Sequence, residues 1–339
     1  MLLHALSPAM TTACVGVIGC LALLSTDLRP KGLSPIDGHY QRMVESEFEA
    51  NAPFRDVSVH FWTAARLALF NQADTDVIIG EEDWLFTAEE FRRASSEVDL
   101  ETELSRTIEQ LSALGITLIP VIVPDKARIY EDMLPHARLY EIELRYGRLK
   151  TLLADYGFPV IDLEVALRDG RTSAETFMRT DTHWSPAGAE VAAKAIAAEL
   201  SDMHGDTAAF ETTTLQAVLF EGDLARFLET GPFATWIGPQ PEAIAVPETT
   251  STGGADLLFG DPTIPIALVG TSFSAREDFN FAGFLSQHTG LDVINLATIG
   301  EGPFAPMRSY LASETLKSSP PSIVIWELPE RYISVRETP

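Results

Sequence analysis

The stretch RTDTHWSPAGAE, residues 179–190, places an aspartate and a histidine two positions apart, directly before a helix signal. A carboxylate beside an imidazole can orient the ring and stabilise its charged form, which is the role of the acid in a Ser-His-Asp triad. In extended backbone, residues two positions apart point to the same side. Asp181 could therefore hold one ring nitrogen of His183 while the other nitrogen takes a proton from a nucleophile.

A candidate nucleophile lies much later in the chain, in PIALVGTSFSA, residues 265–275. An apolar strand pattern there runs into Gly270, Thr271 and Ser272, and a helix pattern follows. Glycine permits a sharp turn, and backbone N–H groups at the start of a helix favour developing negative charge. This is the logic of a nucleophile elbow, although the G-x-S-x-G form is absent. Ser272 is the predicted nucleophile, and His183 its general base.

Other interpretations of these residues stay open at this point. The Gly-Thr-Ser turn could be an ordinary helix cap, with Asp181 a structural cap and His183 packed on Trp184. A metal site is a further alternative, but no second histidine lies nearby and no cysteine follows Cys20. We therefore expect neither a metal nor a cofactor.

The segments that must hold these residues alternate between helix and strand patterns. Strand patterns cover 116–124, 158–163, 265–270, 291–297 and 322–329, and helix patterns cover 99–115, 140–157, 185–200, 276–290 and 305–316. This alternation predicts an α/β fold with a mostly parallel sheet flanked by helices. Ligands bind such sheets at the carboxyl ends of the strands, where Ser272 is expected. Residues 76–86 predict two short strands around a turn, and the less regular 201–260 predicts a few short strands or an insertion.

The N-terminal region has a different character. Residues 5–24 carry no charged side chain, and their number is close to what a bilayer core requires. We expect a membrane anchor or signal segment over 1–24, with Cys20 in a lipoprotein-like VIGC box as an alternative. A linker and packing helix are expected over 25–75, and the catalytic domain over 76–339.

The charge balance bears on partners. Among 339 residues, 24 are Lys or Arg and 49 are Asp or Glu, a formal net charge of −25. Such a surface repels polyanions, so nucleic acid is not an expected partner. The 46% hydrophobic content is enough for one large core or two modest ones.

Taken together, DTHWSPAGA at 181–189 and the later GTSFS at 270–274 resemble the periplasmic alginate O-acetyltransferase family, whose catalytic domain is SGNH-hydrolase-like. Ordinary SGNH enzymes carry the serine block first, whereas this family has the permuted order seen here. Further segments match in order: EEDWLFTAEEF (81–91), VIVPDKARIYEDMLP (121–135), EGDLARFL (221–228) and SIVIWELPERYI (322–333). The resemblance covers about residues 76 to 335 and implies an SGNH-hydrolase-like fold.

The resemblance also implies roles for individual residues. Ser272 would be the nucleophile, His183 the general base and Asp181 its orienting carboxylate. Backbone N–H groups near Ser272 would contribute to an oxyanion hole. Further oxyanion or substrate contacts are expected from Asn295, Gly300, Gly302, Arg331 and Tyr332.

The implied activity is an O-acetyltransferase that moves an acetyl group, through an acetyl-serine, onto hydroxyls of an exopolysaccharide during its export. A membrane-bound O-acyltransferase would supply the acetyl group, other export proteins would be partners, and the enzyme would be periplasmic and anchored to the inner membrane. Because alginate is a polyanion and the chain is acidic, the acceptor need not be alginate itself. A carbohydrate acetylesterase with the same triad and a non-catalytic glycan-binding scaffold are the alternatives.

Overall fold

The computed structural model describes residues 36–51, 55–94, 98–201, 209–252 and 265–333, and short stretches at 16–17, 19–21, 23–24, 26–29 and 32–34. The predicted anchor or signal segment lies mostly outside these residues. Within the described part, no helix has the length and apolar character that a membrane span needs. The chain divides into two compact units, one of residues up to Phe70 with Glu229–Ile237, the other of Asn71–Leu228 with Gly238 onward.

Where the sequence predicted one packing helix over 25–75, the described residues of the smaller unit form α2 (His39–Asn51) and α3 (Arg55–Phe70). The short 3-10 helix η6 (Gly231–Phe233) belongs to the same unit. The ring of Phe61 meets that of Phe233 edge-on, with 6.2 Å between their centroids. An aromatic contact therefore links α3 to a segment far along the chain.

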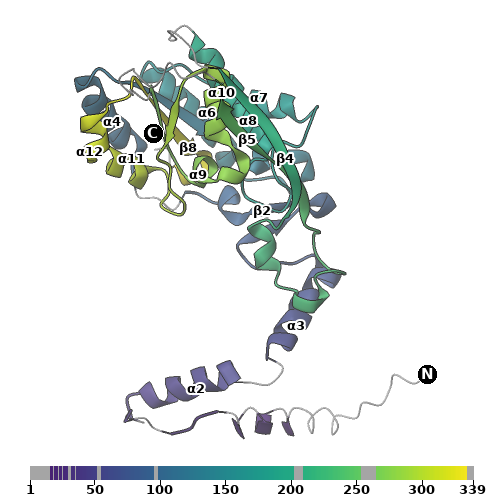
Figure 1. Cartoon of the computed structure of the whole chain (residues 1–339). Helices are drawn as coiled ribbons and strands as arrows, with labels where there is room; N and C mark the ends of the chain where they lie inside the picture. The colour runs from purple at the N-terminus through teal and green to yellow at the C-terminus, as the bar shows by residue number, and fades with distance from the viewer. Residues whose placement is uncertain are drawn as a thin grey trace. The chain divides into compact units, whose positions relative to one another are not determined.

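The larger unit is built on a four-stranded sheet in the order β3-β8-β6-β7. Its strands are β3 (Thr117–Val123), β6 (Ile266–Val269), β7 (Val293–Asn295) and β8 (Ile323–Pro329). Each neighbouring pair is parallel, as the βα alternation predicted. All four strands therefore end at one edge of the sheet, and the α/β fold class is confirmed (Figure 1).

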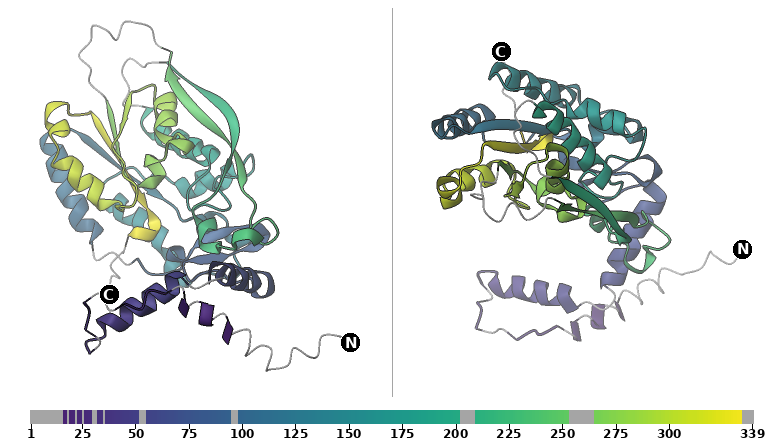
Figure 2. Two further views of the ribbon diagram at one scale, coloured as in Figure 1. Left: turned by 60° about the horizontal axis from the view of Figure 1, so that its bottom comes forward. Right: turned by 45° about the horizontal axis from the view of Figure 1, so that its top comes forward.

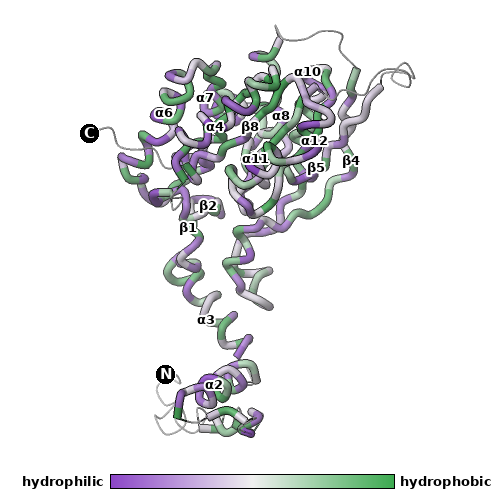
Figure 3. Tube along the Cα trace, turned by 90° about the vertical axis from the view of Figure 1, so that its left-hand side faces the viewer, coloured by the Kyte–Doolittle hydropathy of each residue, from purple (hydrophilic) through white to green (hydrophobic). Residues whose placement is uncertain are grey.

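Helices cover both faces of this sheet. Alternate side chains of a strand point to opposite faces, so Ile119 and Val121 pack in one apolar cluster while Leu118 and Ile122 pack in another. The first cluster takes its helical residues from α7 (Leu163–Gly170), α8 (Pro186–Glu199) and α10 (Phe281–Thr289), and the second from α4 (Leu100–Ala113), α6 (Tyr140–Asp155) and α11 (Phe304–Leu311). The colouring in Figure 3 shows apolar residues gathered in inner elements such as α8 and β8.

Two antiparallel pairs accompany the central sheet. The predicted short pair is β1 (Val77–Ile79) with β2 (Leu85–Thr87). The other pair, β4 (Phe210–Phe220) with β5 (Glu242–Ser251), forms a long two-stranded ribbon in the region where the sequence predicted a few short strands or an insertion (Figure 2). The remaining short elements are α5 (Lys126–Ile129), α9 (Ser272–Ala275), α12 (Glu314–Ser318), η1 (Glu81–Asp83), η2 (Ala88–Phe91), η3 (Glu131–Met133), η5 (Leu224–Leu228), η8 (Glu277–Phe279) and η9 (Glu330–Tyr332).

Three predicted elements differ in the structure. Residues 158–163 form no strand; Asp162 accepts a hydrogen bond from Val165 N at 3.3 Å and so begins α7 there. The helix predicted over 276–290 breaks at Asn280, which has a left-handed φ of 52°. The helix predicted over 305–316 is interrupted at Ser313, whose hydroxyl caps α12 by accepting from Leu316 N.

Candidate active site

The predicted nucleophile lies at the carboxyl end of β6, an inner strand of the sheet. The strand ends at Val269, Gly270 and Thr271 make the turn, and Ser272 is the first residue of α9. The Thr271 hydroxyl accepts a hydrogen bond from Phe273 N at 3.3 Å and caps this short helix. Ser272 is half-buried, so its hydroxyl stands at the sheet edge within reach of solvent.

Asp181 and His183 lie on a closed loop between Phe177 and Trp184, which form an isolated antiparallel bridge. Met178 N donates to His183 O at 3.1 Å across this loop. Directly afterwards, Ser185 caps α8, so the chain is held on both sides of the acid and the histidine. The loop is therefore a rigid support.

The three predicted catalytic side chains meet in one hydrogen-bonded row. His183 Nδ1 lies 2.6 Å from Asp181 Oδ1, and His183 Nε2 lies 2.7 Å from Ser272 Oγ. An ionised carboxylate can only accept, so His183 Nδ1 carries the proton and Nε2 is left to accept from the serine hydroxyl. This is the tautomer that a general base for Ser272 needs.

The Asp181 carboxylate is kept ionised by its surroundings. Burial acts to raise its pKa, but hydrogen bonds from the His183 side chain and from the backbone N–H groups of Asp223 and His183 hold the pKa well below its usual range. Asp223 N donates at 2.9 Å, and Arg276 Nη1 approaches at 3.3 Å. The acid therefore stays charged across the whole physiological pH range.

The sequence analysis assigned no role to two further residues of this site, Asp223 and Arg276. Asp223 belongs to the segment EGDLARFL (221–228), and its carboxylate accepts from Thr182 N at 2.8 Å. A side chain at Gly222 would collide with the Thr180 carbonyl oxygen, 2.0 Å from the Cβ position, so the segment can approach the catalytic loop this closely only with glycine. Arg276 follows the nucleophile by one helical turn and contacts Asp181.

The cluster of Asp181, His183 and Asp223 has the donor atoms of a metal site. Two of its three residues, however, are already engaged: both oxygens of Asp181 accept hydrogen bonds, and both His183 nitrogens have partners. The Arg276 guanidinium beside Asp181 would also repel a cation. The donor set therefore fits a triad better than a metal.

Lys126 holds the catalytic loop through hydrogen bonds to its backbone carbonyl groups. Its buried ammonium donates to the carbonyl oxygens of Arg179 at 2.9 Å and Asp181 at 3.0 Å, and also to that of Leu85. Burial lowers the pKa of Lys126 to about 8, against the raising effect of nearby carboxylates. The segments 81–91 and 121–135 thus meet at the loop that carries Asp181.

Of the residues predicted for the oxyanion hole, Asn295 contacts the nucleophile turn directly, whereas Gly300 and Gly302 lie in the loop after β7. Asn295, at the end of β7, uses its amide Nδ2 to donate to Ser274 O at 2.7 Å, so it lies next to the nucleophile turn. Gly300 and Gly302 have left-handed φ values of 82° and 66° in the loop after β7. That loop is tied to the nucleophile turn by Thr298 N, which donates to Gly270 O at 3.1 Å. Asn295 is therefore a brace of the turn, and the two glycines shape the loop beside it.

Arg331 and Tyr332 follow β8 in η9. The guanidinium of Arg331 lies over the ring of Phe273, 5.3 Å from its centroid, and over that of Tyr332 at 4.6 Å. Arg331 is only 4% exposed and also faces Glu89, with Nε 3.3 Å from the carboxylate. Arg331 thus lies beside the residue that follows Ser272, and Tyr332 contacts Arg331.

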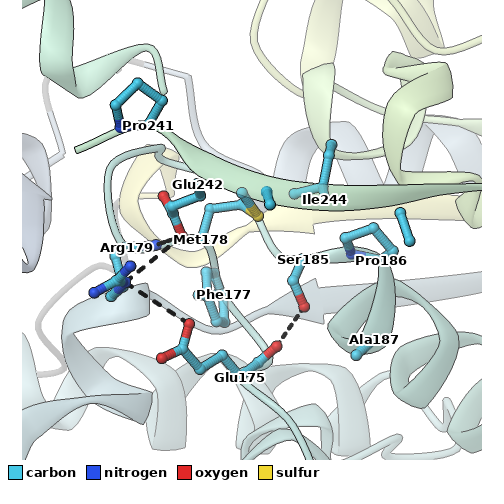
Figure 4. A pocket seen from close by; sticks show the side chains of 12 residues that line it. Glu175, Phe177, Met178, Arg179, Ser185, Pro186, Ala187, Pro241, Glu242 and Ile244 are labelled. Carbon is cyan, nitrogen blue, oxygen red and sulfur yellow. Dashed lines mark hydrogen bonds and ion pairs between the residues drawn. The ribbon is translucent and has the colours of Figure 1, made fainter. Parts of the chain in front are cut away.

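A pocket of about 380 Å³ adjoins the catalytic loop. Its walls include residues 175, 177–179 and 185–187, which precede and follow Asp181 and His183, and residues 241–245 around the start of β5. Figure 4 shows Arg179 between the carboxylates of Glu175 and Glu242 at the pocket wall. The pocket therefore shares its walls with the loop that carries the acid and the base.

Comparison with known proteins agrees with this geometry. Residues 77–330 match the family described as SGNH hydrolase-like domain, acetyltransferase AlgX. The chain belongs to this family. The matched range contains the whole catalytic row together with Lys126, Asp223, Arg276 and Asn295.

Relatives and solved structures extend the comparison. The chain is 36% identical to the "Probable alginate O-acetylase AlgJ" of Pseudomonas fluorescens, over 88% of this chain and 79% of that protein. It is 35% identical to the protein of the same name from Pseudomonas aeruginosa, over 88% and 81%. The O-acetyltransferase domain of Pseudomonas putida AlgJ superposes with a TM-score of 0.68 at 33% identity, covering 77% of this chain and 93% of that one. The predicted family, the SGNH-like fold and the class of O-acetyltransferase are confirmed.

Proposed function

We propose that this protein acetylates hydroxyls of an alginate-like exopolysaccharide through an acetyl-Ser272 intermediate. The observation that carries the proposal is the unbroken row from Asp181 through His183 to Ser272, with 2.6 and 2.7 Å between successive partners. The proteins named alginate O-acetylase AlgJ, with which the chain shares about a third of its residues, support this acceptor class.

In the first half-reaction, Ser272 Oγ attacks the carbonyl carbon of the acetyl donor while its proton passes to His183 Nε2. Asp181 stabilises the imidazolium that forms and stays ionised itself. The tetrahedral intermediate then collapses, the bond to the donor's oxygen or sulfur breaks, and the leaving group takes the proton from His183. The product is acetyl-Ser272.

In the second half-reaction, a sugar hydroxyl gives its proton to His183 Nε2 and attacks the acetyl carbon. The bond to Ser272 Oγ breaks, and the serine takes the proton back from His183. The backbone N–H of Ser272 itself, at the start of α9, is suited to stabilise the oxyanion in both steps, and such a donor contributes about 3 kcal/mol. Water in place of the sugar hydroxyl would give hydrolysis, and Ser272 is open enough to solvent to admit it.

The partners belong to the proposal. A membrane-bound O-acyltransferase would supply acetyl groups, and other export proteins would present the polymer. This places the enzyme in the periplasm, held at the inner membrane by the uncharged N-terminal segment. The net charge of −25 opposes the approach of a polyuronate, so the acceptor range should include glycans less charged than alginate.

The test is covalent labelling with an activated acetyl ester, followed by intact-protein and peptide mass spectrometry. We expect one acetyl group on Ser272, none on Ser272→Ala, and unchanged labelling of Ser105→Ala, which removes an exposed hydroxyl on α4. Equal labelling of wild type and Ser272→Ala would overturn the proposal. Adding alginate oligosaccharides then separates transfer to the sugar from release of free acetate.

A further inference from the structure

A buried carboxylate lies directly beneath the nucleophile turn. Glu327, on β8, is 1% exposed, and its carboxylate accepts from Thr271 N at 2.7 Å and from Thr271 Oγ1 at 3.0 Å. It also accepts from Ser274 Oγ at 3.1 Å. Three donors from the residues on either side of Ser272 therefore converge on one side chain of the neighbouring strand.

The strand register explains this convergence. Val269 pairs with Trp326, so the turn that follows β6 begins opposite the next residue of β8. A Cβ at Gly270 would lie 2.4 Å from Glu327 Oε2, which means that the carboxylate fills the space a side chain would take. Glycine at this position is required by Glu327 as well as by the turn.

Glu327 differs from most of the buried acids of the described chain, among which only Glu90 also lacks an ion pair. Asp125 and Glu330 each contact arginines, at 2.5 Å and 2.7 Å. Glu327 makes no such ion pair within the residues that the structure describes, and Arg331 acts on it only at longer range. A buried charge without an ion pair lowers the stability of the folded state. The presence of Glu327 at this position therefore points to a role other than stability.

A second brace holds the other side of the same turn. Asn295 of β7 donates to Ser274 O at 2.7 Å, while its own carbonyl accepts from Ala297 N at 3.1 Å. The strands on both sides of β6 thus each send a polar side chain to the turn. Thr271 and Ser274 are held from opposite sides, with Ser272 between them.

We infer that Glu327 is a positioning residue of the reaction: through Thr271 and Ser274 it sets the direction in which Ser272 Oγ faces His183. It touches neither the acetyl group nor the acceptor. This inference rests on the proposed role of Ser272. Displacing a reacting group by about 1 Å costs about a hundredfold in rate, so a loosened turn should slow chemistry more than binding.

The experiment compares acetyl-enzyme formation from an activated ester in single-turnover mode for four variants. Glu327→Gln should form acetyl-Ser272 roughly ten- to a hundredfold more slowly, with the half-saturating ester concentration little changed. Thr271→Val should be slowed similarly, and Thr271→Ser, which keeps the hydroxyl, should lose much less. Glu330→Gln is the matched control, because this carboxylate is equally buried but bonds to Arg128 and not to the turn.

The outcomes separate this inference from the proposed function. If folded Glu327→Gln acetylates Ser272 as fast as wild type does, the positioning role is refuted. The proposed function of the triad is not affected by that result. A slow rate in Glu330→Gln equal to that in Glu327→Gln, measured per folded molecule, also overturns it, because the effect would then be general. Failure of wild type to acetylate Ser272 would instead refute the proposed function.

Discussion

Replacing Glu327 by glutamine should stabilise the protein at neutral pH even though it slows the reaction. Burial raises the pKa of Glu327 from 4.5 to about 6, despite hydrogen bonds from Thr271 and Ser274 that lower it. A rise of this size corresponds to about 2 kcal/mol that the folded state loses by keeping the group ionised. Glutamine is neutral at every pH and resembles the protonated side chain in shape, but its amide nitrogen cannot accept a hydrogen bond, so the turn loses part of the hold that the carboxylate gives it.

The direction in which stability changes with pH follows from proton binding. A folded carboxyl with a raised pKa binds more protons than the unfolded one, so its contribution to stability is lost as pH rises from about 4.5 to 6. The two proteins should therefore be equally stable near pH 4, and the variant should gain about 2 kcal/mol above pH 7. For a unit of this size, that is about 4 to 8 °C in melting temperature.

The assay is a series of paired urea and thermal unfolding curves of wild type and Glu327→Gln between pH 4 and 8. Only the difference between the proteins matters, because all other titrating groups are common to both. A difference that is constant with pH, or a variant less stable than wild type at pH 8, would show that Glu327 carries no such cost. The carboxylate would then be an ordinary structural acid.

Three other substitutions test the site. Asp181→Asn should lower kcat by about 10⁴-fold, the size seen when a triad loses its acid, with the fold retained in circular dichroism. Gly270→Ala should destabilise by about 1–3 kcal/mol in urea unfolding, since the new methyl group meets Glu327 at 2.4 Å; an unchanged midpoint would contradict the close packing. Lys126→Met leaves buried carbonyl groups of the catalytic loop without their donor, so it should lower the free energy of unfolding by about 2–5 kcal/mol. The control is Lys150→Met, which replaces a half-buried lysine on α6 and should lower the free energy of unfolding by less than about 1 kcal/mol.

The triad was accessible from the sequence because each of its members lies in a short local pattern. A helix cap follows Asp181 and His183, and a strand-glycine signal precedes Ser272. Parallel strands end at the same sheet edge, so a residue after β6 could be placed at the site edge in advance. The distances between the three side chains, by contrast, depend on how the catalytic loop closes onto that edge.

The supporting residues could not be predicted in the same way. Glu327 and Lys126 act on backbone and hydroxyl groups of distant segments, and no spacing in the sequence encodes such contacts. Asp223 acts through its backbone N–H as well as through its carboxylate. Every residue except proline has a backbone N–H, so the residue type does not reveal this role. The apolar run at 158–163 predicts a strand that the structure does not contain, because periodicity alone does not separate a buried strand from a buried connection.

The position of β8 has a consequence for truncated forms of the chain. It is the final strand of the described chain, yet it is inserted between β3 and β6. A fragment that stops before residues 323–329 would leave β6 without a neighbour on that side, and the turn around Ser272 would lose the carboxylate that accepts from Thr271. We therefore expect such a fragment to keep the serine but to lack the support that holds it in place.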